Sequence, residues 1–347
     1  MDEATTKLDH HEGRGPGERE VGDRASEPPP SRQADSEGAP FTPIENPSTW
    51  TILRGIVRSV RPHQWVKNTF VLAPMIFAHE LTNLSIAKRA VGAFGTFCLL
   101  AGAIYTLNDL LDVEADRVHP VKRFRPIASG AVPVGVAKAL IAVLMLVALG
   151  GAALGPWQFL AVAVGYFVLQ TAYSLRLKRI AYVDVGCIAA GFVLRVLAGF
   201  FAIQTPKSHA PISLYMIACT AFLALFLGFG KRRHELTGAN AKRQRKALEA
   251  YSARALFWAL TISGLAAVGT YLAYTLDAHT ERFFRSEWLW LTTIHPLIGV
   301  LRFLQLVRDR PRAESPTQEM LRDVPFMLNL VVWVIEVIAI VYRLRLS

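Results

Sequence analysis

The chain has 347 residues, 52% of them hydrophobic, and a formal net charge of +11. This composition is too apolar for a typical soluble protein. Because the basic residues lie between long apolar runs, the charge disfavours nucleic acid and favours anionic lipid headgroups or an anionic substrate. The first 48 residues differ, with 11 acids and 5 bases.

Residues 1–48 are rich in Pro, Gly, Ser and Glu and contain few large apolar side chains. Such a segment buries too little apolar surface to offset the entropy of ordering, so we predict a disordered acidic N-terminal tail. It has no basic segment followed by an apolar one, so no cleaved signal peptide is expected. Residues 49–347 are predicted to form the membrane domain.

Nine apolar runs have roughly the length of 20 residues that a helix needs to cross a bilayer. Lys67, Asn68 and Pro74 interrupt the first run, which makes it the weakest of the nine. The three cysteines fall inside runs and are expected to be free thiols. The predicted spans are 66–82, 88–111, 134–154, 156–176, 182–203, 212–230, 254–276, 288–306 and 325–343.

Loop charge predicts the orientation. One set of loops carries 18 Lys and Arg residues and the opposite set carries seven. The positive-inside rule places the richer set in the cytoplasm, together with the N-terminal tail. The sequence therefore predicts an all-α integral membrane bundle of about nine transmembrane helices.

An acidic motif follows the second predicted span, in YTLNDLLDVEADRVHPVKRFRPIASG. In a continuous helix, Asn108, Asp109, Asp112 and Asp116 share an arc of about 100°. Carboxylates on one face repel one another unless a cation lies between them, and Mg²⁺ prefers oxygen ligands of this kind. The spacing favours a Mg²⁺ site over a solvated helix end, and Glu114 points away from the shared face.

Basic residues follow the acidic motif directly. Lys122, Arg123 and Arg125 are either ordinary cytoplasmic-side charges or a clamp on phosphate oxygens. Lys67, within RPHQWVKN, lies where a helix should already have entered the membrane. It either snorkels to the interface or has a function there.

Two later segments place further charges near the same face. Asp184 and Arg195 share a helix face three turns apart, and a mid-span arginine is costly unless it faces a polar cavity. Asp184 is alternatively a helix cap. Lys231, Arg232 and Glu235, in GKRRHEL after the sixth span, are near enough to that end of the bundle to close over the site. Walker-type glycine loops, HExxH and GxSxG are absent from the sequence, which disfavours P-loop enzymes, metalloproteases and serine hydrolases.

The motif Asn108-Asp109-x-x-Asp112-x-x-x-Asp116, at the cytoplasmic end of the second of nine spans, resembles the UbiA-type intramembrane prenyltransferase superfamily. The resemblance covers about residues 55–345. Aromatic prenyltransferases of this superfamily carry a second aspartate-rich motif after the sixth span. Here that loop reads GKRRHEL, which has a single acid. The departure weighs against a prenyl diphosphate donor.

The segments RPHQWVKN, NDLLDVEADRVHPVKRFRPIASG, LRVLAG and GKRRHEL are together similar to the decaprenyl-phosphate phosphoribosyltransferase branch. That resemblance implies a Mg²⁺-dependent enzyme in the plasma membrane, with its active site on the cytoplasmic face. It transfers 5-phosphoribose from phosphoribosyl diphosphate (PRPP) to a polyprenyl phosphate, for cell-wall arabinan synthesis. Its partners are these substrates and membrane lipids, not nucleic acid, and a homo-oligomer is left open.

On this reading the candidate residues fall into three groups. The candidate catalytic residues are Asp109, Asp112 and Asp116, and the candidate metal ligands are Asn108, Asp109, Asp112 and Asp116. The candidate substrate-binding residues are Lys67, Tyr105, Lys122, Arg123, Arg125, Tyr173, Lys178, Asp184, Arg195, Lys231, Arg232 and Glu235.

Two alternatives remain. A prenyltransferase that moves an isoprenoid chain onto an aromatic acceptor uses the same first motif. A membrane transporter would line an ion path with buried Asp and Arg, but it should show internal repeats with paired interrupted helices. The sequence shows no convincing repeat, and most charges gather at one face.

Overall fold

A computed structural model describes residues 42–78, 80–205, 212–237, 250–309 and 316–342. The chain from Thr42 onward forms one compact unit, in which every regular element of the described residues is helical. Most of the tail predicted at 1–48 lies outside the described residues. Ile44 donates its backbone N–H to the Ser129 carbonyl at 2.9 Å, so the end of that segment packs with the helices.

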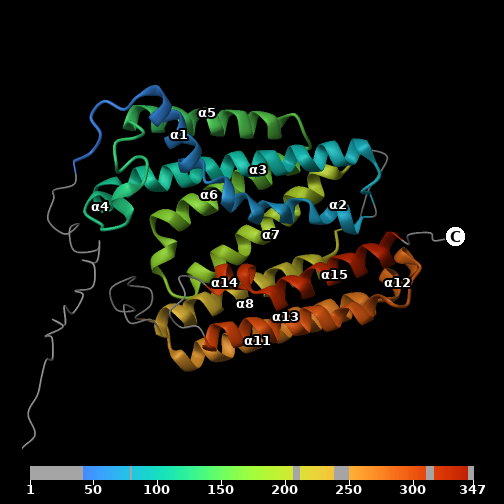
Figure 1. Ribbon diagram of the computed structural model, residues 1–347. Coiled ribbons are helices and arrows are strands. Elements are labelled where there is room, and N and C mark those ends of the chain that lie inside the picture. The colour runs from blue at the N-terminus through green and yellow to red at the C-terminus, as the bar shows by residue number, and fades with distance from the viewer. Residues whose placement is uncertain (1–41, 79, 206–211, 238–249, 310–315, 343–347) are drawn as a thin grey trace, which may run out of the picture. The chain divides into compact units, whose positions relative to one another are not determined.

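Eight helices among the described residues are long and apolar enough to cross a membrane (Figure 1). They form most of the bundle, and η4 extends α13 at its start. They are α3 (Leu84–Leu111), α5 (Val134–Ala153), α6 (Trp157–Leu175), α7 (Val183–Ile203), α8 (Leu214–Thr237), α11 (Ala253–Thr275), α13 (Ile294–Asp309, after η4 at Leu289–Thr293) and α15 (Val324–Tyr342).

Most of the shorter helices lie at the ends or flanks of the bundle, whereas η1 and α2 pack against α3 and α7. In Figure 1, α4 lies at one end and α12 at the other, while α1 crosses the side of the bundle near α5. These elements are α1 (Thr49–Val60), η1 (Pro62–Val71), α2 (Ala73–Phe77), α4 (Val113–Arg117), η2 (Lys122–Phe124), η3 (Leu177–Arg179), α12 (Ala278–Phe284) and α14 (Pro316–Arg322).

The predicted class, an all-α membrane bundle of about nine helices, is confirmed, with a difference at the first predicted span. Residues 66–82 form the end of η1 followed by the five-residue helix α2, rather than one long helix. Prolines stand near the start of each element, and Asn68 is buried with its side-chain oxygen bonded to Arg195. The segment is held by polar contacts inside the bundle, so it needs no continuous apolar helix.

Local sequence explains where the principal helices begin. Asn83 caps α3, since its side-chain oxygen accepts hydrogen bonds from the backbone N–H groups of Ser85 and Ile86. Ser252 caps α11 in the same way. Such caps satisfy donors that the first helical turn leaves without a partner, and each contributes about 1 kcal/mol.

The bundle has a protein-buried centre and a lipid-facing exterior. In α3 and α7, 56% of the membrane window is buried, against 11% in α5 and α15. The core around α3, α6 and α7 includes Phe97, Leu100, Phe159 and Tyr166. Helices that remain apolar while exposed are expected to contact lipid. The cysteines are all free thiols, as expected.

Candidate functional site

The acidic motif lies where α3 gives way to α4. The α3 helix ends at Leu111, and Asp112 connects it to α4 with φ −94° and ψ 6°. The continuous helix assumed for the predicted arc is therefore broken at Asp112. Backbone bonds from Asp112 to Asn108 and from Asp116 to Asp112 keep the two helices close to one axis.

Two of the motif's carboxylates face arginines. Asp109 accepts a hydrogen bond from Arg61 at 2.6 Å, and the Arg125 guanidinium lies 3.3 Å from the same carboxylate oxygen. Arg125 also donates to Asp116 at 2.7 Å. Both acids are almost fully buried. The guanidinium carbon of Arg61 lies 5.2 Å from the centre of the Tyr105 ring, which fixes its approach. Buried carboxylates of this kind need such cationic partners.

The other two motif residues are open to a further ligand. The side-chain oxygen of Asn108 is buried and accepts no hydrogen bond from any described residue. Asp112 keeps 46% of its side chain exposed, and its closest cation is the Lys178 ammonium at 3.8 Å. Glu114, predicted to point away, is 81% exposed and pairs with Arg117.

No group of three or more His, Cys, Asp and Glu side chains within the described part of the chain is arranged to hold a metal ion. The donors nevertheless fit Mg²⁺, which takes only one or two carboxylates from a protein and fills its remaining positions with water and substrate phosphates. Within the described residues, the Asn108 oxygen has no hydrogen-bond partner, and Asp112, although 3.8 Å from the Lys178 ammonium, keeps 46% of its side chain exposed.

Lys67 lies among cations. Its side chain is accessible to solvent, yet the protein atoms around it are dense enough to lower its pKa. Partial burial is the main cause, and the charges of Lys231, Arg195 and Arg61 add to it, bringing the pKa to about 8. Cations brought together in this way repel one another, and an anion between them relieves that repulsion.

Arg195 is bonded to protein groups on three sides. Its guanidinium donates to Asn68 at 2.8 Å, to the Gly191 carbonyl at 2.9 Å and to the Tyr166 hydroxyl at 2.6 Å. It is 6% exposed and also stacks on Phe192, with its guanidinium carbon 5.2 Å from the ring centre. The residue predicted to line a substrate cavity thus joins η1, α6 and α7, while its charge still reaches Lys67.

Asp184, Arg232 and Glu235 form a buried ionic cluster between α7 and α8. The Asp184 carboxylate lies 2.8 Å from Arg232, which also pairs with Glu235. The Tyr251 hydroxyl donates to Asp184 and accepts from the Tyr182 backbone N–H. Burial and the bond to Asp184 raise the pKa of Tyr251. These acids are engaged with protein partners rather than turned toward an open site.

The remaining predicted residues occupy the same end of the bundle. Lys122 is exposed on η2, and the Arg123 guanidinium lies 5.0 Å from the Phe124 ring centre. Tyr173 is close enough to Arg232 to affect its electrostatics. Lys178 reaches Asp112 from η3.

Sequence reasoning did not select four of the residues found here. The missed residues are Arg61, Asn68, Tyr166 and Tyr251. Arg61 and Asn68 bound the RPHQWVKN segment, so their position beside Lys67 was a usable signal. Tyr166 and Tyr251 reach their partners from segments distant in sequence, and local pattern gives no such signal.

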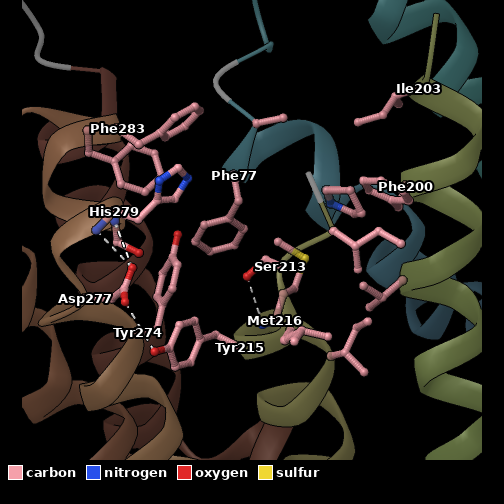
Figure 2. Close-up of a pocket in the computed structure, with 18 of the residues that line it drawn as sticks. Phe77, Phe200, Ile203, Ser213, Tyr215, Met216, Tyr274, Asp277, His279 and Phe283 are labelled. Carbon is pink, nitrogen blue, oxygen red and sulfur yellow. Dashed lines mark hydrogen bonds between the residues drawn. The ribbon is translucent and has the colours of Figure 1, made fainter. Parts of the chain in front are cut away.

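A separate cavity of about 500 Å³ lies farther along α7. Figure 2 shows Phe77, Phe200, Tyr274 and Phe283 around it, contributed by α2, α7, α11 and α12. Counted along α7 at 1.5 Å per residue, Phe200 lies about 7.5 Å beyond Arg195 and about 24 Å beyond Asp184. The cavity wall is largely apolar, so it suits a hydrocarbon rather than a phosphate.

The arrangement described so far has counterparts in known proteins. A family model described as the UbiA prenyltransferase family matches residues 69–322. The chain belongs to this family. It is accordingly an integral membrane protein, and its all-helical fold is that of the UbiA family.

The curated relatives include two that match most of this chain and one that matches half of it. A decaprenyl-phosphate phosphoribosyltransferase of Mycobacterium tuberculosis is 35% identical over 295 residues, which is 82% of this chain and 94% of the relative. One from Corynebacterium glutamicum is 33% identical and covers 83% and 87%. A chloroplastic homogentisate phytyltransferase of Arabidopsis thaliana is 36% identical, but over only 50% of this chain and 47% of its own.

A solved UbiA homologue from Archaeoglobus fulgidus, bound to GPP and Mg²⁺, has a TM-score of 0.62 to this chain at 18% identity. The match covers 83% of this chain and 99% of that one. At this identity the likeness establishes the fold alone.

Proposed function

We propose that this UbiA-family protein transfers 5-phosphoribose from PRPP to a polyprenyl phosphate, releasing diphosphate, to supply a precursor of cell-wall arabinan. The observation that carries the proposal is its similarity to decaprenyl-phosphate phosphoribosyltransferases over 82% of its length and 94% of theirs. The match to a prenyl-transferring relative extends over only half of each chain.

The cations near Lys67 supply the donor site. Lys231, on α8, and Arg61, at the end of α1, each act electrostatically on Lys67, which lies on η1. PRPP carries phosphate groups at both ends, and ammonium and guanidinium donors recognise these strongly. Lys122, Arg123 and Lys178 add positive charge at the same end of the bundle.

The proposed reaction does not require the protein to transfer a proton. An oxygen of the lipid phosphate, already anionic at neutral pH, forms a bond to ribose C1. The bond from C1 to the diphosphate oxygen breaks, and diphosphate leaves with the electron pair. No general base is needed, so catalysis consists of positioning the reactants and stabilising charge on the leaving group.

A magnesium ion, when bound with the donor, would neutralise charge on the departing diphosphate. Asn108 and Asp112 are the residues that would hold it. Asp109 and Asp116 are balanced by Arg61 and Arg125 in this structure. Both arginines remain partly exposed, so they are available to phosphate oxygens as well.

The apolar cavity shown in Figure 2 would hold part of the acceptor's isoprenoid chain. Its largely apolar lining matches hydrocarbon, and its distance along α7 leaves the phosphate end of the lipid near the cations. The orientation predicted from loop charge puts those cations and the acidic motif at the cytoplasmic face of the plasma membrane, where a soluble donor can reach them.

The test supplies purified protein and Mg²⁺ with PRPP labelled in the ribose and a polyprenyl phosphate, and follows label into the lipid phase. We expect lipid labelling that EDTA abolishes. Asp112→Ala should lower the rate by about 10²-fold or more, the size typical of losing electrostatic stabilisation at a reacting centre. Glu114→Ala, which removes an exposed acid of the same segment, is the matched control and should retain the wild-type rate.

Transfer from a prenyl diphosphate to an aromatic acid, without transfer from PRPP, would overturn the proposal. Equal losses in Asp112→Ala and Glu114→Ala would remove the acidic motif from the reaction, even if the overall transfer were observed.

A further inference from the structure

The helix α1 presents three distinct faces. At 100° per residue, Trp50, Leu53 and Val57 fall within about 60° of one another, and Arg54 and Arg58 occupy the next 80° or so. The apolar three are 73%, 52% and 60% exposed. The two arginines are also exposed, and among the described residues neither has an ion-pair partner. An exposed apolar stripe beside two unpaired cations is typical of a helix lying in a membrane interface.

The third face of α1 is fixed to the bundle. Gly55 and Ser59 are buried, and the helix packs on α3. A Cβ atom at Gly55 would lie 2.5 Å from a methyl group of Val132, so the contact admits no side chain. The helix is therefore held against its neighbours on one side and open on the other two.

The end of α1 leads directly into the acidic site. Arg61 follows the last residue of α1 in a left-handed conformation, with φ 53°, which only a minority of non-glycine residues adopt. Its guanidinium lies 2.6 Å from Asp109. The position of α1 thus determines where this cation stands relative to the motif.

We propose that α1 binds anionic phospholipid headgroups through Arg54 and Arg58 while Trp50, Leu53 and Val57 enter the lipid, and that this contact holds Arg61 in place at Asp109. The neighbouring helix α5 is long and apolar enough to cross a membrane and only 11% of its membrane window is buried, so the apolar stripe of α1 would continue its lipid-facing surface. Each basic residue near an anionic surface contributes about a fivefold gain in affinity.

A depth measurement tests the lipid contact without any reference to the reaction. The full chain carrying Leu53→Cys is labelled with a nitroxide and placed in nanodiscs of phosphatidylcholine with phosphatidylglycerol. We expect the label to be relaxed by oxygen, which concentrates in lipid, and shielded from a water-soluble nickel reagent. A label relaxed mainly by nickel would place this face in water, and one shielded from both would place a protein segment over it. Either result overturns the proposal.

An activity measurement tests the link to Arg61, and this part rests on the proposed phosphoribosyl transfer. The transfer rate is compared in discs of phosphatidylcholine alone and in discs that also contain phosphatidylglycerol. In wild type we expect a severalfold higher rate with the anionic lipid. For Arg54→Gln/Arg58→Gln, the ratio of the rate with phosphatidylglycerol to the rate without it should be near one. Arg54→Lys/Arg58→Lys should restore the ratio, because it keeps the charges.

Lys138→Gln is the matched control, since it removes an exposed base of α5 that has no place in the proposal. The link between lipid charge and the site would be contradicted if the double glutamine variant kept the full lipid response. Loss of that response in the double lysine variant would contradict it as well. Absence of any transfer from PRPP in wild type would instead count against the proposed function and leave the depth result standing.

Discussion

Two buried arginines, Arg195 and Arg232, differ in what surrounds them. Arg195 is bonded to an amide oxygen, a backbone carbonyl and a phenol, all of them uncharged. Arg232 is bonded to the carboxylates of Asp184 and Glu235. Within the described residues, the first has no carboxylate partner and the second has two.

The difference indicates separate roles for the two residues. An uncompensated buried charge acts over several ångströms because little water screens it. Arg195 accordingly contributes to the lowered pKa of Lys67, and Arg232 is not among the causes of that shift. Arg195 makes its surroundings attractive to an anion, whereas Arg232 holds α7 and α8 together.

The largest effect is expected from breaking the ionic cluster of Asp184, Arg232 and Glu235. Arg232→Met leaves the buried Asp184 and the partly buried Glu235 without their cation, which should reduce the free energy of unfolding by about 3–5 kcal/mol. Denaturation in detergent or lipid discs measures the loss. Adding Asp184→Asn and Glu235→Gln should recover much of it. A triple variant as unstable as the single one would mean that charge is not what binds this cluster.

The second-largest effect is expected from Lys67→Ala. Loss of a charged hydrogen bond to phosphate corresponds to about 1.5–3 kcal/mol, or a rise of roughly 10- to 100-fold in the KM for PRPP. Mg²⁺ dependence should persist, because the acidic motif is intact. Steady-state kinetics at several Mg²⁺ concentrations separate the two quantities, and an unchanged KM would exclude Lys67 from the donor site.

The KM for PRPP should change with pH as the Lys67 ammonium loses its proton. Its pKa of about 8 means that the side chain is charged below that pH and neutral above it. Only the charged form attracts phosphate, so the KM for PRPP should rise by up to about tenfold between pH 7 and pH 9. Lys67→Arg, which stays charged, should show a flat profile over this range. A flat wild-type profile would contradict the assignment.

The smallest effect is expected in a direct comparison of Arg195 with Arg232. Arg195→Gln removes a positive charge near Lys67, so the midpoint of the KM profile should move to higher pH, by less than about one unit. The double variant Arg232→Met/Asp184→Asn removes one charge of each sign and should leave the midpoint in place. Equal shifts in both variants would erase the distinction between the two arginines.

The fold class was predictable because bilayer thickness dictates the length of an apolar run, and the runs from 88–111 onward correspond to long helices. The acidic motif was also visible, since its spacing is local. The break at Asp112 was not, because a helical wheel assumes an uninterrupted helix. Nor could spacing show that Arg195 reaches Asn68, a contact between residues 127 positions apart.

The close contact between η1 and α7 has a consequence for the order in which the protein assembles. A Cβ atom at Gly199 would lie 1.9 Å from the Val71 carbonyl oxygen, so the backbone of η1 rests directly on that glycine. Its other anchor, Arg195, lies on the same helix. The polar segment around Lys67 leaves the ribosome long before either partner exists. It can reach its final place only after α7 has entered the bilayer, so the proposed donor site is completed by a segment that was synthesised early.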